Sequence, residues 1–193
     1  MPKRIIILRH GEKHGELSLS TQGKARADAL ARNFLGKAAR HPLFKKASTL
    51  VAITLHTVET ATPSAHSWSL PVTAFSISPG LAAATKEKML DARTQQAALD
   101  VLQRKGTVVM IWEHHRIAST TLSPECTLRH LLHLDRLGDA VPNAWLDDDY
   151  DTIWIVDYDR KGRPASFRTV SQHFRMRRAK PKQRRARKGA KRA

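Results

Sequence analysis

The segment Ile5-Ile6-Ile7-Leu8-Arg9-His10-Gly11-Glu12 decides the fold of this chain. Its four consecutive apolar residues, three of them β-branched, predict a strand that is buried on both faces. Arg9 and His10 follow this strand directly, and Gly11 lets the chain turn. In open α/β sheets, ligands bind at the carboxyl ends of the strands, so both side chains are candidates for a functional site. An imidazole can act as a nucleophile, and a guanidinium binds phosphate oxygens in a fixed fork.

Length and composition predict a globular protein. The chain has 193 residues, of which 41% are hydrophobic, which is enough to bury a core in one domain; we place that domain at residues 1–172. No window approaches the ~20 apolar residues of a membrane span. We also expect no signal peptide, because no apolar region followed by a cleavage site is found at the N-terminus. With Cys126 as the single cysteine, no internal disulfide can form. We therefore expect a cytoplasmic protein.

The C-terminal end carries most of the positive charge. Residues 175–193 contain eleven basic residues and no acidic ones, so of the net charge of +17 only +6 belongs to the rest of the chain. Segment 173–193 is predicted to be disordered because it cannot bury an apolar face. It is either a solubilising extension or an arm for polyanions, in which Arg175 to Arg192 bind nucleic acid or acidic lipid without sequence preference. Residues 175–193 include no aromatic side chain that could stack on bases.

Strands and helical stretches alternate along the chain. Further strands are predicted over residues 50–55, 72–77, 107–112 and 152–156, with a hairpin partner over 165–170. Helices are predicted over residues 24–35, from His56 to Pro63 (which ends or kinks the helix), over 82–104 as one or two helices, and between Ser123 and Gly138. This alternation predicts an α/β domain with a largely parallel sheet.

A second histidine follows a second buried strand. His114 comes after residues 107–112, as His10 comes after residues 5–8. Parallel strands have their carboxyl ends at the same edge of the sheet, so the two rings are expected to face each other across one crevice. Arg116 is expected at the surface, with an inward orientation as the alternative.

Four short motifs carry a resemblance to a known family. They are Leu8-Arg9-His10-Gly11-Glu12, Leu19-Ser20 with Gly23, Glu59-Thr60-Ala61, and Trp112-Glu113-His114. Together they resemble the histidine phosphatase superfamily, and the Trp-Glu-His variant resembles a small bacterial branch of it. The resemblance runs from Arg4 to Tyr158. It implies a phosphoglycerate mutase-like fold, a three-layer α/β/α sandwich with a mostly parallel central sheet. It also implies phosphoryl transfer through a phosphohistidine, without a cofactor, on a phosphorylated small molecule or phosphoprotein.

The resemblance also implies roles for single residues. His10 would be the nucleophile, Arg9 a phosphate clamp and His114 the second pocket histidine. A protonated His114 and the backbone N–H of His115 would stabilise the charge of the transferred phosphoryl group together with Arg9.

Two positions depart from the family pattern. His56 stands where a second arginine is usual, and an imidazole lacks the bidentate fork. No motif identifies the general acid. Glu113 and Glu87 are candidates, although Glu113 is expected to point away from His114 in an extended segment. Without a general acid, the enzyme would favour good leaving groups such as phosphohistidine or acyl phosphate.

Two functions follow from these observations. One is a phosphomonoester or phosphoramidate hydrolase acting through His10. The other is a catalytically impaired anion-binding protein, tethered to nucleic acid by its basic tail. A mutase is a weaker third reading. A metal site is not expected, because the spacings His10/His14 and His130/His133 lack the glutamate of a His-Glu-x-x-His arrangement.

Overall fold

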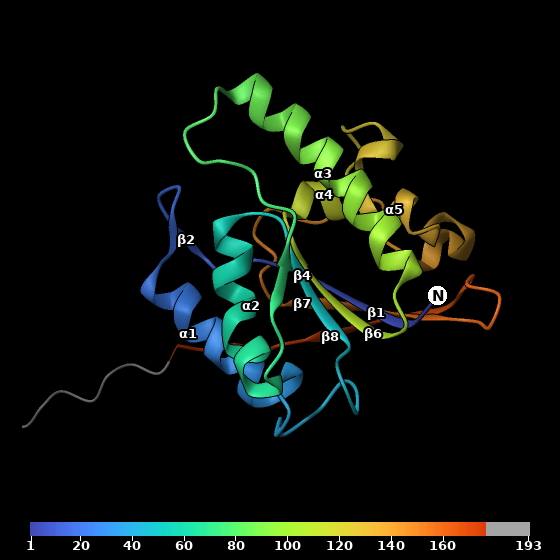
Figure 1. Cartoon of the computed structure of the whole chain (residues 1–193), viewed down its shortest axis with the longest axis horizontal. Helices are drawn as coiled ribbons and strands as arrows, with labels where there is room; N and C mark the ends of the chain where they lie inside the picture. The colour runs from blue at the N-terminus through green and yellow to red at the C-terminus, as the bar shows by residue number, and fades with distance from the viewer. Residues whose placement is uncertain (177–193) are drawn as a thin grey trace, which may run out of the picture.

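A six-stranded sheet forms the centre of the computed structural model, which describes residues 1–176 (Figure 1). The strands are β1 (Pro2–Arg9), β4 (Thr49–Ala52), β5 (Val72–Ala74), β6 (Gly106–Trp112), β7 (Thr152–Tyr158) and β8 (Pro164–Ser171). Their order across the sheet is β5-β4-β6-β1-β7-β8. The first four are parallel; at one side of the sheet β7 pairs antiparallel with β1, and β8 pairs antiparallel with β7. The strands predicted from the sequence are confirmed, although β4 and β5 each end three residues earlier than predicted, and Leu55 of the predicted strand 50–55 already belongs to a helix.

Helices cover both faces of this sheet (Figure 1). On one face lie α1 (Thr21–Leu30) and α2 (Leu55–Trp68); on the other lie α3 (Ala83–Gln103), α4 (His114–Ile117) and α5 (Leu128–Leu131). Alternate residues of β1 enter the two resulting cores. Ile5 and Ile7 pack with the side chains of α3, whereas Ile6 and Leu8 pack with those of α1 and α2. The predicted three-layer α/β/α sandwich with a mostly parallel sheet is thereby confirmed.

Local backbone chemistry moves several helix boundaries. The helix predicted over residues 24–35 begins earlier, at Thr21, where the Ser20 hydroxyl accepts a hydrogen bond from the Gly23 N–H, and α1 passes into a π-helical turn after Leu30. Pro63 does not end α2, which continues to Trp68. Proline removes one hydrogen bond from the helix, and the reciprocal cap at Thr54 secures the start of α2.

The predicted helix between Ser123 and Gly138 is broken into pieces. Two 3₁₀ segments, Pro124–Cys126 and Leu134–Ala140, flank the four-residue α5. Thr127 caps α5 anew, and His133 adopts a left-handed conformation with φ of 61°, which stops a continuous helix. Leu128, Leu132 and Leu134 are nevertheless buried, and Leu131 is partly buried against the same core, so the apolar residues of this segment face the core although the helix is broken.

Little of the predicted basic tail belongs to the described part of the chain. Residues 177–193, with the proposed nucleic-acid contacts there, lie outside the described residues. Just before them, the centre of the Phe174 ring lies 4.5 Å from the guanidinium carbon of Arg26.

Among residues 1–176, no helix has both the length and the apolar character to cross a membrane.

Helix α3 offers a matched pair for measuring its contribution to the core. Leu90 is 4% exposed and Leu99 is 68% exposed. Leu90→Ala should lower the free energy of unfolding by about 2–5 kcal/mol, because it removes a packed side chain and leaves a cavity. Leu99→Ala should change it by less than about 0.5 kcal/mol. Denaturant unfolding of both variants measures the difference, and equal losses would contradict the placement of α3.

Candidate functional site

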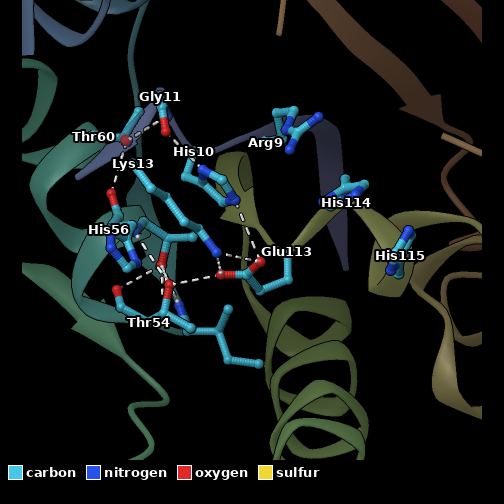
Figure 2. Close-up of polar contacts among 12 residues, drawn as sticks. Arg9, His10, Gly11, Lys13, Thr54, His56, Thr60, Glu113, His114 and His115 are labelled. Atoms are coloured by element: carbon cyan, nitrogen blue, oxygen red, sulfur yellow. Dashed lines mark hydrogen bonds and ion pairs between the residues drawn. The ribbon is translucent and has the colours of Figure 1, made fainter. Parts of the chain in front are cut away.

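The carboxyl ends of three parallel strands bring the candidate residues together (Figure 2). His10 follows β1, Thr54 and His56 begin α2 after β4, and Glu113 and His114 follow β6. The centroid of the His10 ring lies 5.9 Å from that of His56 and 6.4 Å from that of His114. The two histidines that the sequence analysis paired therefore belong to one cluster.

The His10 ring is fixed in one orientation. It is 1% exposed, and its Nδ1 lies 2.7 Å from the Gly11 carbonyl oxygen. A carbonyl oxygen only accepts hydrogen bonds, so Nδ1 carries the proton and the neutral ring keeps its lone pair on Nε2. This Nε2 lies 3.3 Å from Oε2 of Glu113 but is not aligned for a hydrogen bond, and it has no hydrogen-bond partner among the described residues. The geometry leaves the lone pair of Nε2 available.

Backbone contacts hold the loop that carries His10. The Gly11 N–H donates to the Thr60 hydroxyl (2.9 Å), which in turn donates to the His56 carbonyl (2.7 Å). A Cβ atom at Gly11 would lie 2.8 Å from the carbonyl oxygen of Gly23, closer than packed atoms approach. The glycines and the threonine of these motifs thus hold β1, α1 and α2 together around His10.

Acidic residues of the same motifs act as supports. Glu12 accepts hydrogen bonds from Arg26, and Glu59 accepts one from the Leu19 N–H at 2.6 Å. Burial disfavours the charged form of Glu12, but Arg26 outweighs this effect and lowers the pKa of Glu12. Both carboxylates therefore hold the loop between β1 and α1 in place, away from the His10 ring nitrogens.

The Glu113 carboxylate lies in the centre of the cluster. It accepts a hydrogen bond from the Thr54 hydroxyl at 3.0 Å and contacts the Lys13 ammonium at 3.2 and 3.3 Å (Figure 2). Burial would raise the pKa of Glu113, but the protonated form of His10 and the Lys13 ammonium lower it well below its ordinary range. Glu113 is thus ionised at neutral pH and holds no proton for a leaving group.

The expectation that Glu113 points away from His114 is wrong. A carboxylate oxygen of Glu113 and a ring nitrogen of each of His10 and His114 all lie within 4.8 Å of one another. The alternation of an extended segment ends at Glu113, because this residue is the N-cap of α4 and the chain turns there. A strand pattern therefore could not predict the direction of this side chain.

Arg9, next to His10 in the sequence, is buried, and one of its guanidinium N–H groups remains available to an anion. Its Nη1 donates to the Asp147 carbonyl at 2.6 Å, and its guanidinium carbon lies 3.8 Å from the centroid of the Tyr150 ring. Burial lowers the pKa of Arg9, yet a guanidinium remains charged in proteins. Its Nε is buried without a hydrogen-bond partner within residues 1–176, so the group can still donate to an anion.

His56 is less suited to bind an anion than the arginine it replaces. Its Nε2 lies 3.0 Å from the Gly15 carbonyl oxygen, so this nitrogen carries the proton. Burial, with a further contribution from Lys13, lowers the pKa of His56. The ring is therefore neutral near pH 7, and its remaining nitrogen can only accept a hydrogen bond.

His114 is also neutral, which corrects the expectation of a protonated ring. Burial, reinforced by the charges of Arg9 and His115, lowers its pKa to about 4. Its Nε2 lies 3.0 Å from Oδ1 of Asp147, and the half-exposed His115 ring contacts the same oxygen at 2.8 Å. Nδ1 of His114 is buried and has no partner in the described part of the chain.

A cavity of about 220 Å³ adjoins this cluster. Its lining includes Lys13, Thr54, His56, Glu113 and His114, with Ile77 and Leu90 as apolar surface. The cavity offers room for a substrate next to the candidate catalytic groups.

Arg116 does not point to solvent, which corrects the sequence expectation. It is 5% exposed and donates to Glu87 at 2.5 Å and to Asp91 at 2.9 Å. The two carboxylates of α3 neutralise the arginine and so make its burial favourable. Glu87 is engaged in this ion pair, away from His10, which weakens its case as the general acid.

Sequence reasoning missed Lys13, Thr54, Asp147 and Tyr150. Thr54 was detectable, because a threonine three residues before Thr57 fits a helix N-cap. Lys13, Asp147 and Tyr150 lie in loops without periodicity, and only the folded chain brings them to His10 and Arg9.

No protein-family model and no curated protein matches the sequence. The chain aligns with the solved structure of the protein histidine phosphatase SixA complexed with tungstate, at 15% identity and a TM-score of 0.44, over 88% of this chain and 97% of that chain. It also aligns with a mycobacterial glucosyl-3-phosphoglycerate phosphatase at 17% identity and a TM-score of 0.48, over 88% and 97% of the two chains. A protein described as mycobacterial hydrolase 1 aligns at 16% identity and a TM-score of 0.47, over 88% and 96%.

The lowered pKa of His114 predicts a pH dependence of stability. Between pH 6.5 and about 4 the unfolded chain binds a proton at this ring that the folded chain does not, so the free energy of unfolding falls as the pH falls through this range. His114→Gln should remove this contribution and give a shallower decline in denaturant unfolding. His14→Gln, on the exposed hairpin strand β2 (Lys13–His14), should keep the native slope. Equal slopes for native protein and His114→Gln would refute the assignment.

Proposed function

We propose that this chain is a phosphatase of the histidine phosphatase superfamily, which hydrolyses a phosphomonoester or phosphoramidate through a phosphohistidine at His10. The observation that carries the proposal is the buried Nε2 of His10, which has no hydrogen-bond partner among residues 1–176 and whose ring is fixed through Nδ1. A neutral imidazole held in this tautomer is nucleophilic near pH 7.

Donors for an anion already surround this atom. The Glu113 carboxylate is held beside Nε2 by the Thr54 hydroxyl and the Lys13 ammonium. A phosphoryl group entering from the cavity would displace this carboxylate and take over the same donors, together with Arg9. Fixed donors of this kind stabilise the charge on the equatorial oxygens during phosphoryl transfer.

The first chemical step transfers the phosphoryl group to His10. The Nε2 lone pair forms the new bond to phosphorus, and the bond from phosphorus to the leaving atom breaks with its electron pair going to that atom. Because Glu113 is ionised, no proton is ready for the leaving atom. The reaction should therefore favour groups that depart without one, such as those of phosphohistidine or acyl phosphate substrates.

The second step releases inorganic phosphate. Water attacks phosphorus, Glu113 accepts the proton of the water, and the phosphorus–nitrogen bond breaks so that its electron pair returns to Nε2. An ionised carboxylate next to the phosphorylated ring is suited to this general-base role. In this proposal His10 attacks phosphorus, Glu113 takes the proton of the water, and the neutral His114 can accept a hydrogen bond from that water through Nδ1. Arg9, with the His115 backbone N–H, binds the phosphoryl oxygens.

Covalent labelling tests the nucleophile. The native protein, incubated with a labelled phosphodonor such as acetyl phosphate, should acquire a label that is labile in acid and stable in base. His10→Ala should abolish the label, because it removes the imidazole that is proposed to be phosphorylated. His14→Ala, on the exposed strand β2, should keep the label and serves as the control. Labelling of His10→Ala to the same extent as the native protein would contradict the proposal.

The alternative is an anion-binding protein that has lost catalysis. His56 supports it, because the neutral ring donates only to Gly15. Its tether to nucleic acid would be Arg175 to Arg192, of which residues 177–192 lie outside the described residues. This alternative predicts that native protein binds inorganic phosphate but hydrolyses no phosphorylated substrate.

Substitution of His56 separates the two functions. In an active phosphatase, His56→Arg should raise phosphate affinity and turnover about tenfold, because a charged donor adds roughly 1.5 kcal/mol or more. His66→Arg, at an exposed position of the same helix, should change neither. Phosphate binding by calorimetry, release of phosphate from acetyl phosphate, and circular dichroism as a folding control measure the effect. Absence of hydrolysis in both native protein and His56→Arg would favour the alternative.

A further inference from the structure

Two buried ring nitrogens belong to the same cluster as a carboxylate. Nε2 of His10 and Nδ1 of His114 are both buried and have no hydrogen-bond partner within residues 1–176. One ring nitrogen of each histidine and a carboxylate oxygen of Glu113 lie within 4.8 Å of one another. Buried polar atoms without partners are rare in folded proteins and call for a ligand or another explanation.

The opposite nitrogen of each ring is held by an acceptor. Nδ1 of His10 faces the Gly11 carbonyl at 2.7 Å, and Nε2 of His114 faces the Asp147 carboxylate at 3.0 Å. Metal-binding histidines have this arrangement, with a carbonyl or carboxylate fixing the ring from behind and directing the free lone pair at the ion. Both rings can bind in their neutral form without losing a proton.

The spacing suits a small tetrahedral ion. Two imidazoles and one carboxylate form a common ligand set for Zn²⁺, with bonds of about 2.0–2.2 Å. Tetrahedral ligand atoms at that bond length are separated by roughly 3.3 Å, and Nε2 of His10 and Oε2 of Glu113 are already 3.3 Å apart. A ring nitrogen of His114 lies within 4.8 Å of both ligand atoms, so the third ligand has to move closer when the ion binds.

Two features of the surroundings bear on this site. The Lys13 ammonium contacts Glu113 and would repel a cation, but its side chain is 38% exposed and belongs to a two-residue strand at the surface, so it can move into solvent. Arg9 adds a second positive charge nearby, held over Tyr150. These charges lower metal affinity and favour an ion that is bound reversibly.

A neighbouring cluster is a weaker candidate. His115, Asp147 and the other nitrogen of His114 also lie within 4.8 Å of one another. In that cluster the ring nitrogens already contact Asp147, whose side chain is 80% exposed. The buried triad is favoured because two of its ring nitrogens lack partners.

From this geometry we infer that His10, Glu113 and His114 bind a Zn²⁺ ion, with a fourth position open to water. The ion occupies the lone pair of Nε2 of His10. On the proposed function, bound zinc and the phosphohistidine exclude each other, so zinc is a reversible inhibitor of the site and not its cofactor.

Direct binding measurements test the site without reference to activity. The full chain, freed of metal with a chelator, should bind one Zn²⁺ in calorimetry, and Co²⁺ should give the visible absorption of a tetrahedral complex. Glu113→Gln and His114→Ala should each abolish the Co²⁺ spectrum, with circular dichroism confirming that the variants fold. Asp147→Asn should weaken zinc binding about 10–100-fold.

His115→Ala is the matched control. It should bind zinc as the native protein does, because its ring belongs only to the exposed cluster. Loss of binding in His115→Ala, or stoichiometric binding that survives in both Glu113→Gln and His114→Ala, would overturn the inference.

Competition with labelling tests the exclusion. Saturating zinc should reduce the amount of label incorporated at His10 at least tenfold, and removal of the zinc with a chelator should restore the labelling. A native protein that binds zinc and still labels fully would refute the exclusion. A third outcome separates the two proposals: zinc binding is lost in Glu113→Gln and His114→Ala, but the native protein acquires no label from acetyl phosphate. This outcome would support the metal site and contradict the proposed phosphatase.

Discussion

The hydrogen bond between Nδ1 of His10 and the Gly11 carbonyl is the constraint on which the site depends. It sets the tautomer and turns Nε2 toward the space in front of Glu113. The carbonyl can serve in this way because Gly11 is itself held by Thr60 and packed against Gly23. The reactivity of one ring nitrogen is thus determined by backbone contacts among three separate segments, with the buried strand β1 as their common support.

The electrostatics of the cluster favour an anion, even though one of its central groups is negative. Lys13 and Arg9 are cationic, and the neutral rings of His56 and His114 add no charge. Glu113 balances part of this positive potential from inside the site. Because Glu113 also faces Nε2, the same pocket is able to take either a phosphoryl group that displaces the carboxylate or a cation that uses it.

Much of the fold could be predicted from the sequence because strong local signals agreed with the tertiary structure. The run Ile5 to Leu8 is apolar on both faces, and alternate residues fill two cores. The meeting of His10 and His114 also followed from strand topology alone. The segment between Ser123 and Gly138 was mispredicted, because apolar spacing does not reveal the cap at Thr127 or the left-handed residue His133.

Side-chain directions in the site could not be predicted in the same way. Glu113 turns inward because the chain leaves its extended path at that residue, and Arg116 is buried because Glu87 and Asp91 of α3 neutralise it. Both outcomes depend on groups that are distant in sequence. Loop residues such as Tyr150 carry no periodic pattern, so their contact with Arg9 emerges only after folding.

The close approach of Gly11 and Gly23 has a consequence for how this architecture can change. Neither position has room for even a methyl group, so the backbone that supports the His10 ring cannot be altered by substituting either glycine. The opposite wall is different, since Ser78, Pro79 and Gly80 line the cavity from a loop. Substitutions that change which ligand binds are therefore expected in this loop, whereas the glycine contact that supports His10 cannot vary.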